Sequence, residues 1–163
     1  MARFVIADAS PLIGLARVDG LRWLQPLFGT VWIPTEVHAE VFSGFGAPDE
    51  QLIGQAVTAG WLSVCGPTPD KPVLAELDEG ETACIRLALA HTEGSLVLMD
   101  ERAGRAIATE NGLQVAGTAA VIGMARIKGL IPSAKEIFAH LHASDFRISS
   151  AVIRTILVRL GEA

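Results

Sequence analysis

The chain of 163 residues is half hydrophobic and only 19% charged, a composition that excludes an intrinsically disordered protein. Its length suits one domain with a substantial core, so we expect residues 1–163 to form a single domain. No apolar run is long enough to span a membrane, and Asp8 comes too early for a signal peptide. The formal net charge of −5 argues against strong nonspecific nucleic-acid binding by the chain as a whole.

The cysteines and the distribution of charge bear on location and partners. Cys65 and Cys84 are isolated and form no CxxC pair, so we expect reduced thiols in a cytoplasmic protein. Through residue 101 the chain has 5 Lys and Arg against 14 Asp and Glu, and after it 8 against 4. An acidic first part and a basic last part would suit a metal site beside a phosphate-binding face, although an ordinary solvated surface gives the same counts.

Short apolar runs typical of buried strands recur along the chain, separated by segments in which apolar residues have helical spacing. The predicted strands are 3–7, 30–34, 61–65, 95–100 and 113–117. The predicted helices are one that begins at Pro11, then 19–28, 36–42, 48–60, 77–91, 101–112, 118–128, 133–142 and 149–160. Ser10 and Thr35 are predicted to be N-caps of the first and third helices. The alternation of strands and helices predicts an α/β fold with a parallel sheet covered on both faces.

Two of these strands run directly into aspartates, Asp8 after the first and Asp100 at the end of the fourth. Ligands of open α/β sheets bind beyond the carboxyl ends of the strands, so both are candidate site residues. Glu40, after the second strand, and Glu81, early in the 77–91 helix, could reach the same edge. Four carboxylates repel each other unless a cation neutralises them, and oxygen-only ligands favour Mg²⁺ or Mn²⁺. Such an ion can grip phosphate oxygens and activate water for attack at phosphorus.

Each acidic residue also has a plainer interpretation. Asp8 and Asp100 could cap the helices that follow them, a common role for aspartate in a strand-to-helix loop. Acidic residues near the start of a helix are favoured by the helix dipole in any case. Three neighbours compete with the two glutamates: Glu36 with Glu40, and Asp78 and Glu79 with Glu81.

Together with the sequence around them, these positions resemble the PIN-domain nucleases, and most closely a prokaryotic branch of PIN-like proteins related to VapC-type toxins. The matching segments are "VIADASPLIGLARV" (5–18), "WIPTEVHAEV" (32–41), "LDEGETACIRLAL" (77–89), "LMDERAGRAIA" (98–108) and "LQVAGTAAVIGMARIKGLI" (113–131). They cover well over a third of the chain and occur in the order expected for that family.

The resemblance implies a three-layer α/β/α sandwich with a mostly parallel sheet of about five strands. It assigns binding of Mg²⁺ or Mn²⁺ and catalysis to an acidic quartet, Asp8, Glu40, Glu81 and Asp100. Supporting or substrate-binding roles fall to four further residues, Ser10, Glu101, Arg105 and Thr118. The implied reaction is hydrolysis of phosphodiester bonds by metal-activated water, and one or two ions are both compatible with it.

The function expected from this resemblance is a divalent-metal-dependent endoribonuclease, and because many members of that family are toxins of toxin–antitoxin pairs, a toxin role is compatible with it. The partners it implies are an RNA substrate, a small antitoxin and a second copy of the chain in a homodimer, with no membrane. One alternative is a PIN-like binding or regulatory module with weak or no activity. A second is an acidic-site phosphohydrolase of the haloacid-dehalogenase type, but that chemistry needs an aspartate where this chain has Ser10.

Overall fold

Five short strands form one parallel sheet in the computed structural model, which describes residues 4–44, 46–91 and 93–163. The strands are β1 (Phe4–Ala7), β2 (Val31–Pro34), β3 (Leu62–Cys65), β4 (Ser95–Leu98) and β5 (Gln114–Ala116). Their order is β3-β2-β1-β4-β5, and every pairing is parallel. The predicted parallel sheet of about five strands is confirmed, and position 3 of the first predicted strand lies outside the described residues.

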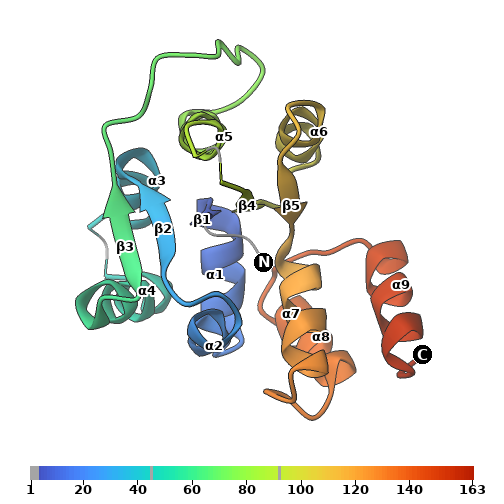
Figure 1. Ribbon diagram of the computed structural model, residues 1–163. Coiled ribbons are helices and arrows are strands. Elements are labelled where there is room, and N and C mark those ends of the chain that lie inside the picture. The colour runs from blue at the N-terminus through green and yellow to red at the C-terminus, as the bar shows by residue number, and fades with distance from the viewer. Residues whose placement is uncertain (1–3, 45, 92) are drawn as a thin grey trace.

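Helices cover both faces of this sheet (Figure 1). They are α1 (Ala9–Arg17), the 3-10 helix η1 (Leu21–Trp23), α2 (Leu24–Phe28), α3 (Thr35–Val41), α4 (Pro48–Ala59), α5 (Glu79–Leu89), α6 (Arg102–Glu110), α7 (Thr118–Ile127), α8 (Ala134–Ala143) and α9 (Ser150–Leu160). α5 and α6 lie on one side of the sheet, whereas α1, α4 and α7 lie on the other. The result is the three-layer α/β/α sandwich that the resemblance implies.

One predicted helix, 19–28, is divided in the structure into η1 and α2. Pro26 supplies a physical reason, because it has no N–H to donate to the carbonyl group one turn earlier. The tighter turn of η1 therefore precedes the short α2 instead of one continuous α-helix.

The centre of the core is β1, in which every residue is buried. Its sequence, Phe-Val-Ile-Ala, is apolar throughout, as a strand with helices on both faces requires. Ile6 is fully buried and pairs in register with Trp32 of β2 and Val97 of β4. The central strand thus holds the sheet together, and its carboxyl end fixes the position of whatever residue follows it.

The strand order reverses between β1 and β4. The chain builds β1, β2 and β3 toward one edge and then crosses over to place β4 and β5 on the other side of β1. In a parallel sheet, such a reversal opens a crevice at the carboxyl ends of the two strands. Asp8 directly follows β1 and Asp100 lies just beyond β4, so both stand at this crevice.

The two predicted N-caps are wrong. α1 begins at Ala9 and α3 at Thr35 itself, so neither Ser10 nor Thr35 occupies the cap position. Each hydroxyl instead donates to a carboxylate, Ser10 to Asp100 at 3.0 Å and Thr35 to Glu36 at 2.7 Å. An ionised acceptor forms a stronger hydrogen bond than a neutral one, which favours these partners over a backbone N–H.

Both cysteines are free thiols in the structure. Cys65 is half-buried and Cys84 is buried. Burial, assisted by the charge of Glu36, raises the pKa of Cys65 to about 11.

Within the described ranges, no helix is both long and apolar enough to cross a membrane.

The central position of β1 leads to a stability prediction. Ile6→Ala should lower the free energy of unfolding by about 2–5 kcal/mol, because it removes a fully buried side chain and leaves a cavity. The matched control is Ile127→Ala, since Ile127 is 79% exposed and should change stability by less than about 0.5 kcal/mol. Urea unfolding of both variants measures the difference, and equal effects would contradict the placement of β1.

Candidate functional site

Asp8 carries a carboxyl group that the fold removes almost completely from solvent. The residue is 5% exposed. This burial raises the pKa of Asp8 to about 7 against the opposing effect of a hydrogen bond with the Ala9 backbone, and the charges of Asp78, Glu40 and Asp100 add to the increase. None of the ion pairs between described residues involves Asp8. A desolvated carboxyl group without a side-chain cation is costly, which makes Asp8 a candidate functional residue.

Glu40 approaches Asp8 across the start of α5. A Cβ atom added to Gly80 would lie 2.9 Å from Asp8 Oδ1 and 3.0 Å from Glu40 Oε2. The two carboxylates therefore converge on one point, and the glycine leaves the space between them open. Burial of its carboxyl group raises the pKa of Glu40, and the charge of Asp78 raises it further.

The first turn of α5 adds two more carboxylates. Asp78 is the N-cap of α5, and its Oδ1 accepts a hydrogen bond from the Glu81 backbone N–H at 2.8 Å. Glu81 is only 6% exposed. Burial, followed by the neighbouring Asp78 carboxyl group, raises the pKa of Glu81 to about 7. Since Asp78 also raises the pKa values of Asp8 and Glu40, its charge acts on the whole group.

The carboxyl group of Glu81 points toward α6. A Cβ atom added to Gly104 of α6 would contact Glu81 Oε2 and Met99 Sδ. A glycine at this position allows α6 to pack directly against the carboxylate. Glu81 is thereby held between α5 and α6, on the β4 side of the crevice.

Among the carboxylates at this crevice, Asp100 accepts the most hydrogen bonds from other described residues. Its Oδ1 accepts from the Thr118 backbone N–H at 2.7 Å, and its Oδ2 accepts from the hydroxyl groups of Thr118 at 2.8 Å and Ser10 at 3.0 Å. Asp100 does not cap α6, whose N-cap position is taken by Glu101, but satisfies the first N–H of α7. A carboxylate has about four acceptor sites, so it retains capacity for a further partner.

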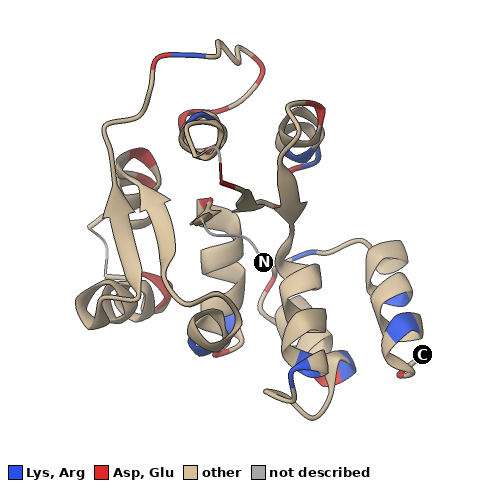
Figure 2. Ribbon diagram, viewed as in Figure 1, with Lys and Arg blue, Asp and Glu red and all other residues tan. Residues whose placement is uncertain are grey.

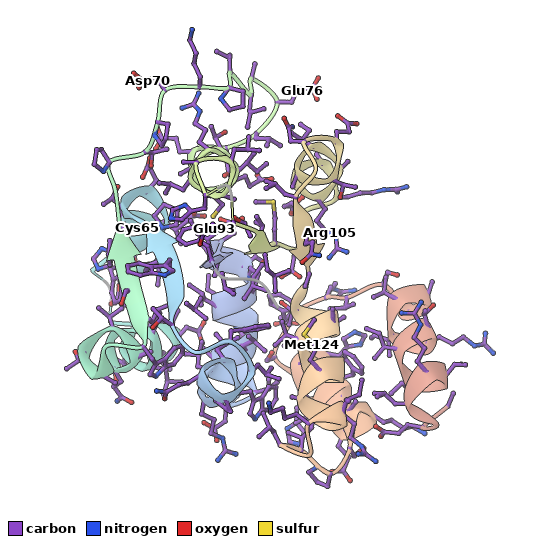
Figure 3. The ribbon with its side chains drawn as sticks, viewed as in Figure 1. Cys65, Asp70, Glu76, Glu93, Arg105 and Met124 are labelled. Carbon is purple, nitrogen blue, oxygen red and sulfur yellow. The ribbon has the colours of Figure 1, made fainter. Side chains whose placement is uncertain are left out.

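Arg105 lies at the margin of this group, and Glu101 does not join it. A Cβ atom added to Gly117 would lie 2.5 Å from Arg105 Nη1 and 2.9 Å from Asp100 Oδ1. Arg105 is half-buried, donates weakly to the Met99 carbonyl at 3.4 Å, and lies beside the junction of β5 and α7 (Figure 3). Glu101 is exposed and makes no capping hydrogen bond in α6.

Glu36, the alternative to Glu40, belongs to a different environment. Its Oε1 accepts hydrogen bonds from Thr35 at 2.7 Å and Thr68 at 3.0 Å. It lines a cavity of about 290 Å³ next to Asp78. The structure therefore places Glu40 with Asp8 and separates Glu36 from them.

Figure 2 shows where the charged residues lie. Acidic residues occur on α3, at the start of α5 and after β1 and β4. Lys and Arg are more widely spread, over α6 and the C-terminal helices and also on α5 and near α1 and α2. An acidic crevice of this kind attracts cations and repels bare phosphate.

The donor atoms at this site are of the type that binds a divalent cation. The group offers only carboxylate oxygens, from Asp8, Glu40, Asp78, Glu81 and Asp100, which is the ligand type of Mg²⁺ and Mn²⁺. In the part of the chain that the structure describes, no three His, Cys, Asp or Glu side chains are close enough to hold an ion as they stand. Gly80 keeps a space open that a Cβ atom would fill, between Asp8 and Glu40. The donors fit, and side-chain rotation would have to bring them together.

Asp78 is the member of this group that the sequence prediction did not select. It appears there only as a competitor of Glu81, although the spacing Asp-x-x-Glu at a helix start is a capping signature that orders both residues. The structure shows that the two are neighbours instead of alternatives.

The raised pKa of Asp8 leads to a stability prediction. Between pH 3.8, its ordinary pKa, and about 7, the folded protein holds a proton that the unfolded chain has lost. The contribution of Asp8 to stability therefore falls as the pH rises through this range and is least favourable above it. In EDTA, Asp8→Asn should stabilise the protein at pH 8 by roughly 2–4 kcal/mol and have little effect near pH 4.

Thermal or urea unfolding at the two pH values measures this effect. Asp70→Asn is the control, since Asp70 lies on the exposed loop before α5 and points away from the body of the protein (Figure 3). A wild type more stable than Asp8→Asn at pH 8 would show that Asp8 is paired in solution.

Comparison with known families identifies the fold. A family model described as a PIN domain matches residues 4–162. Neither the curated proteins nor the solved structures gave a significant match. The family match extends over nearly the whole chain and agrees with the parallel sheet and its strand order. The chain therefore belongs to the PIN-domain family, whose fold is a nuclease fold.

Proposed function

We propose that this PIN-domain protein is a divalent-metal-dependent nuclease that hydrolyses phosphodiester bonds in RNA. The observation that carries the proposal is the convergence of carboxylates, two of them buried, at the crevice between β1 and β4. Asp8 and Glu81 are 5% and 6% exposed, and neither takes part in an ion pair between described residues. Their charges are tolerable when a cation is bound between them.

Different residues of the chain would have different roles at such a site. Asp8, Glu40 and Glu81 come from three different elements and would hold the cation from three sides, with Asp78 close to each of them. Asp100 is fixed in orientation by Ser10 and Thr118, so it would provide a ligand or a proton acceptor at a set position. When bound, the cation supplies Lewis acidity at phosphate and at water.

Arg105 is placed to contact substrate. Its guanidinium group and the Asp100 carboxylate both lie within 3 Å of the position that a Cβ atom of Gly117 would take, and no ion pair within the described ranges occupies the guanidinium group. A guanidinium group can bind two phosphate oxygens at once, which would orient the scissile phosphate against the acidic crevice. RNA as the substrate is supported by the resemblance of the segments around these residues to ribonucleases.

The test combines metal binding with cleavage. Wild-type protein should bind Mn²⁺ in calorimetry and cut a mixed RNA pool. The double variant Asp8→Asn with Asp100→Asn should lose both Mn²⁺ binding and RNA cleavage. Cleavage should fall by more than roughly 100-fold, because the variant removes two proposed metal ligands and not only residues that position them. Glu76→Gln, on the exposed loop before α5, is the matched control and should retain both activities (Figure 3).

Two results would contradict the proposal. If wild-type protein binds Mn²⁺ but cuts neither RNA nor DNA, the site serves a binding module and not a nuclease. If it binds no Mn²⁺, the carboxylates act as helix caps and packing groups alone. Loss of function through misfolding is separated from both by the unfolding curve, since Asn retains the acceptor that Thr118 requires at Asp100.

A further inference from the structure

Beside the acidic crevice, the cavity lined by Glu36 has features that the proposed reaction does not use. It measures about 290 Å³ and lies between α3, α5 and the loop before α5. Asp78 belongs both to its lining and to the carboxylate group around Asp8. Glu36 and Glu40 are one turn apart on α3, so the cavity lies next to the crevice. A nucleotide whose phosphate lies at the crevice would place its base or sugar in this cavity.

Glu36 contributes a carboxylate to the lining of the cavity. Both hydrogen bonds that it accepts from other described residues, from Thr35 and Thr68, end at Oε1, so no other described residue donates to Oε2. Partial burial works to raise the pKa of Glu36, but these hydrogen bonds, one from its own backbone N–H and the charge of Arg86 outweigh it, and the pKa lies below its ordinary value. Glu36 is therefore ionised at neutral pH, with its orientation fixed and one oxygen ready to accept N–H donors.

Arg86 supplies donors on another wall of the same cavity. Its Nε donates to the Pro72 carbonyl at 2.8 Å, which holds the side chain against the loop before α5. Its two terminal nitrogens form no hydrogen bond or ion pair with another side chain in the part of the chain that the structure describes. Glu36 and Arg86 thus line one cavity without pairing with each other. Thr82 adds a hydroxyl group between them on α5.

The charge of the cavity decides which part of a nucleotide fits. Glu36, Asp78 and Glu79 outnumber Arg86, so a phosphate group is repelled. A neutral base can bind to both the negative Glu36 and the positive Arg86, provided that its edge carries N–H donors for Glu36 and an acceptor for Arg86. Guanine has this edge, because its N1–H and N2–H₂ donors stand side by side next to O6. Adenine presents an acceptor at N1, which would face the Glu36 carboxylate and be repelled.

We propose that this cavity is a specificity pocket for a guanine base next to the scissile phosphate. Glu36 accepts hydrogen bonds from N1–H and N2–H₂, and Arg86 donates to O6. Single-stranded RNA is commonly recognised through such base edges. The inference rests on the proposed function for its link to cleavage, but the pocket itself can be tested without cleavage.

The first experiment measures nucleoside binding by NMR titration, because nucleosides carry no phosphate and cannot be cut. Wild-type protein should bind guanosine about 10-fold or more tightly than adenosine, with inosine, which lacks N2–H₂, in between. Glu36→Gln should abolish this preference, since its amide can accept only at one atom and donates at the other. Glu36→Asp keeps the charge but withdraws the carboxylate, and it should also lose the preference. Glu76→Gln should leave the preference unchanged.

The second experiment maps the cut sites in RNA for the same variants. Cuts beside guanine in wild type, and loss of that bias in Glu36→Gln, would support the pocket as the source of specificity. Guanosine preference without any RNA cleavage would support the pocket and refute the ribonuclease. RNA cleavage with equal binding of guanosine and adenosine, unchanged in both Glu36 variants, would overturn the pocket and leave the ribonuclease intact.

Discussion

The mutual repulsion of carboxylates at the end of the central strand is the constraint on which the site depends. Two unit charges 4 Å apart repel by about 4 kcal/mol at an effective dielectric constant of 20, which is a large fraction of the stability of a small domain. Burial first, and this repulsion after it, raise the pKa values of Asp8 and Glu81 to about 7, so protonation limits the cost of placing the two groups there. A fold selected for stability alone would not bury these groups together. Under the proposed function, a cation bound at the crevice would offset this cost.

Three glycines, which have no side chain, allow the carboxylates to come close together. Gly80 separates Asp8 from Glu40, Gly104 allows α6 to touch Glu81, and Gly117 lies between Asp100 and Arg105. At each glycine a single Cβ atom would collide with a functional group. The helices α5 and α6 and the start of α7 can therefore approach the crevice closely, while β1 and β4 set its floor. Stability and function are linked here, because the contacts that shape the crevice are also the contacts between layers.

The sequence was informative where local chemistry decides the structure. Apolar runs predict the strands, their alternation with helices predicts a parallel sheet, and the aspartates at two strand ends predict Asp8 and Asp100 at one edge. Long-range packing decides the rest. Whether Glu36 or Glu40 reaches Asp8 depends on how α3 is rotated against α5. The bond from Ser10 to Asp100 joins residues 90 positions apart, so no local pattern could distinguish it from a cap. The sequence offered Asp78 only as an alternative to Glu81, because its proximity to Asp8 and Glu40 also depends on how the helices pack.

The most direct test of the central claim is the number of protons released when Mn²⁺ binds. Calorimetric titrations at pH 6.5 in buffers with different ionisation enthalpies measure it. Because the pKa values of Asp8 and Glu81 are about 7, both carboxyl groups are largely protonated at that pH, and a cation bound between them must displace protons. We expect release of about one proton or more at pH 6.5, falling toward zero at pH 8.5. Binding with no proton release at either pH, or no binding at all, would contradict the assignment of a metal centre to this crevice.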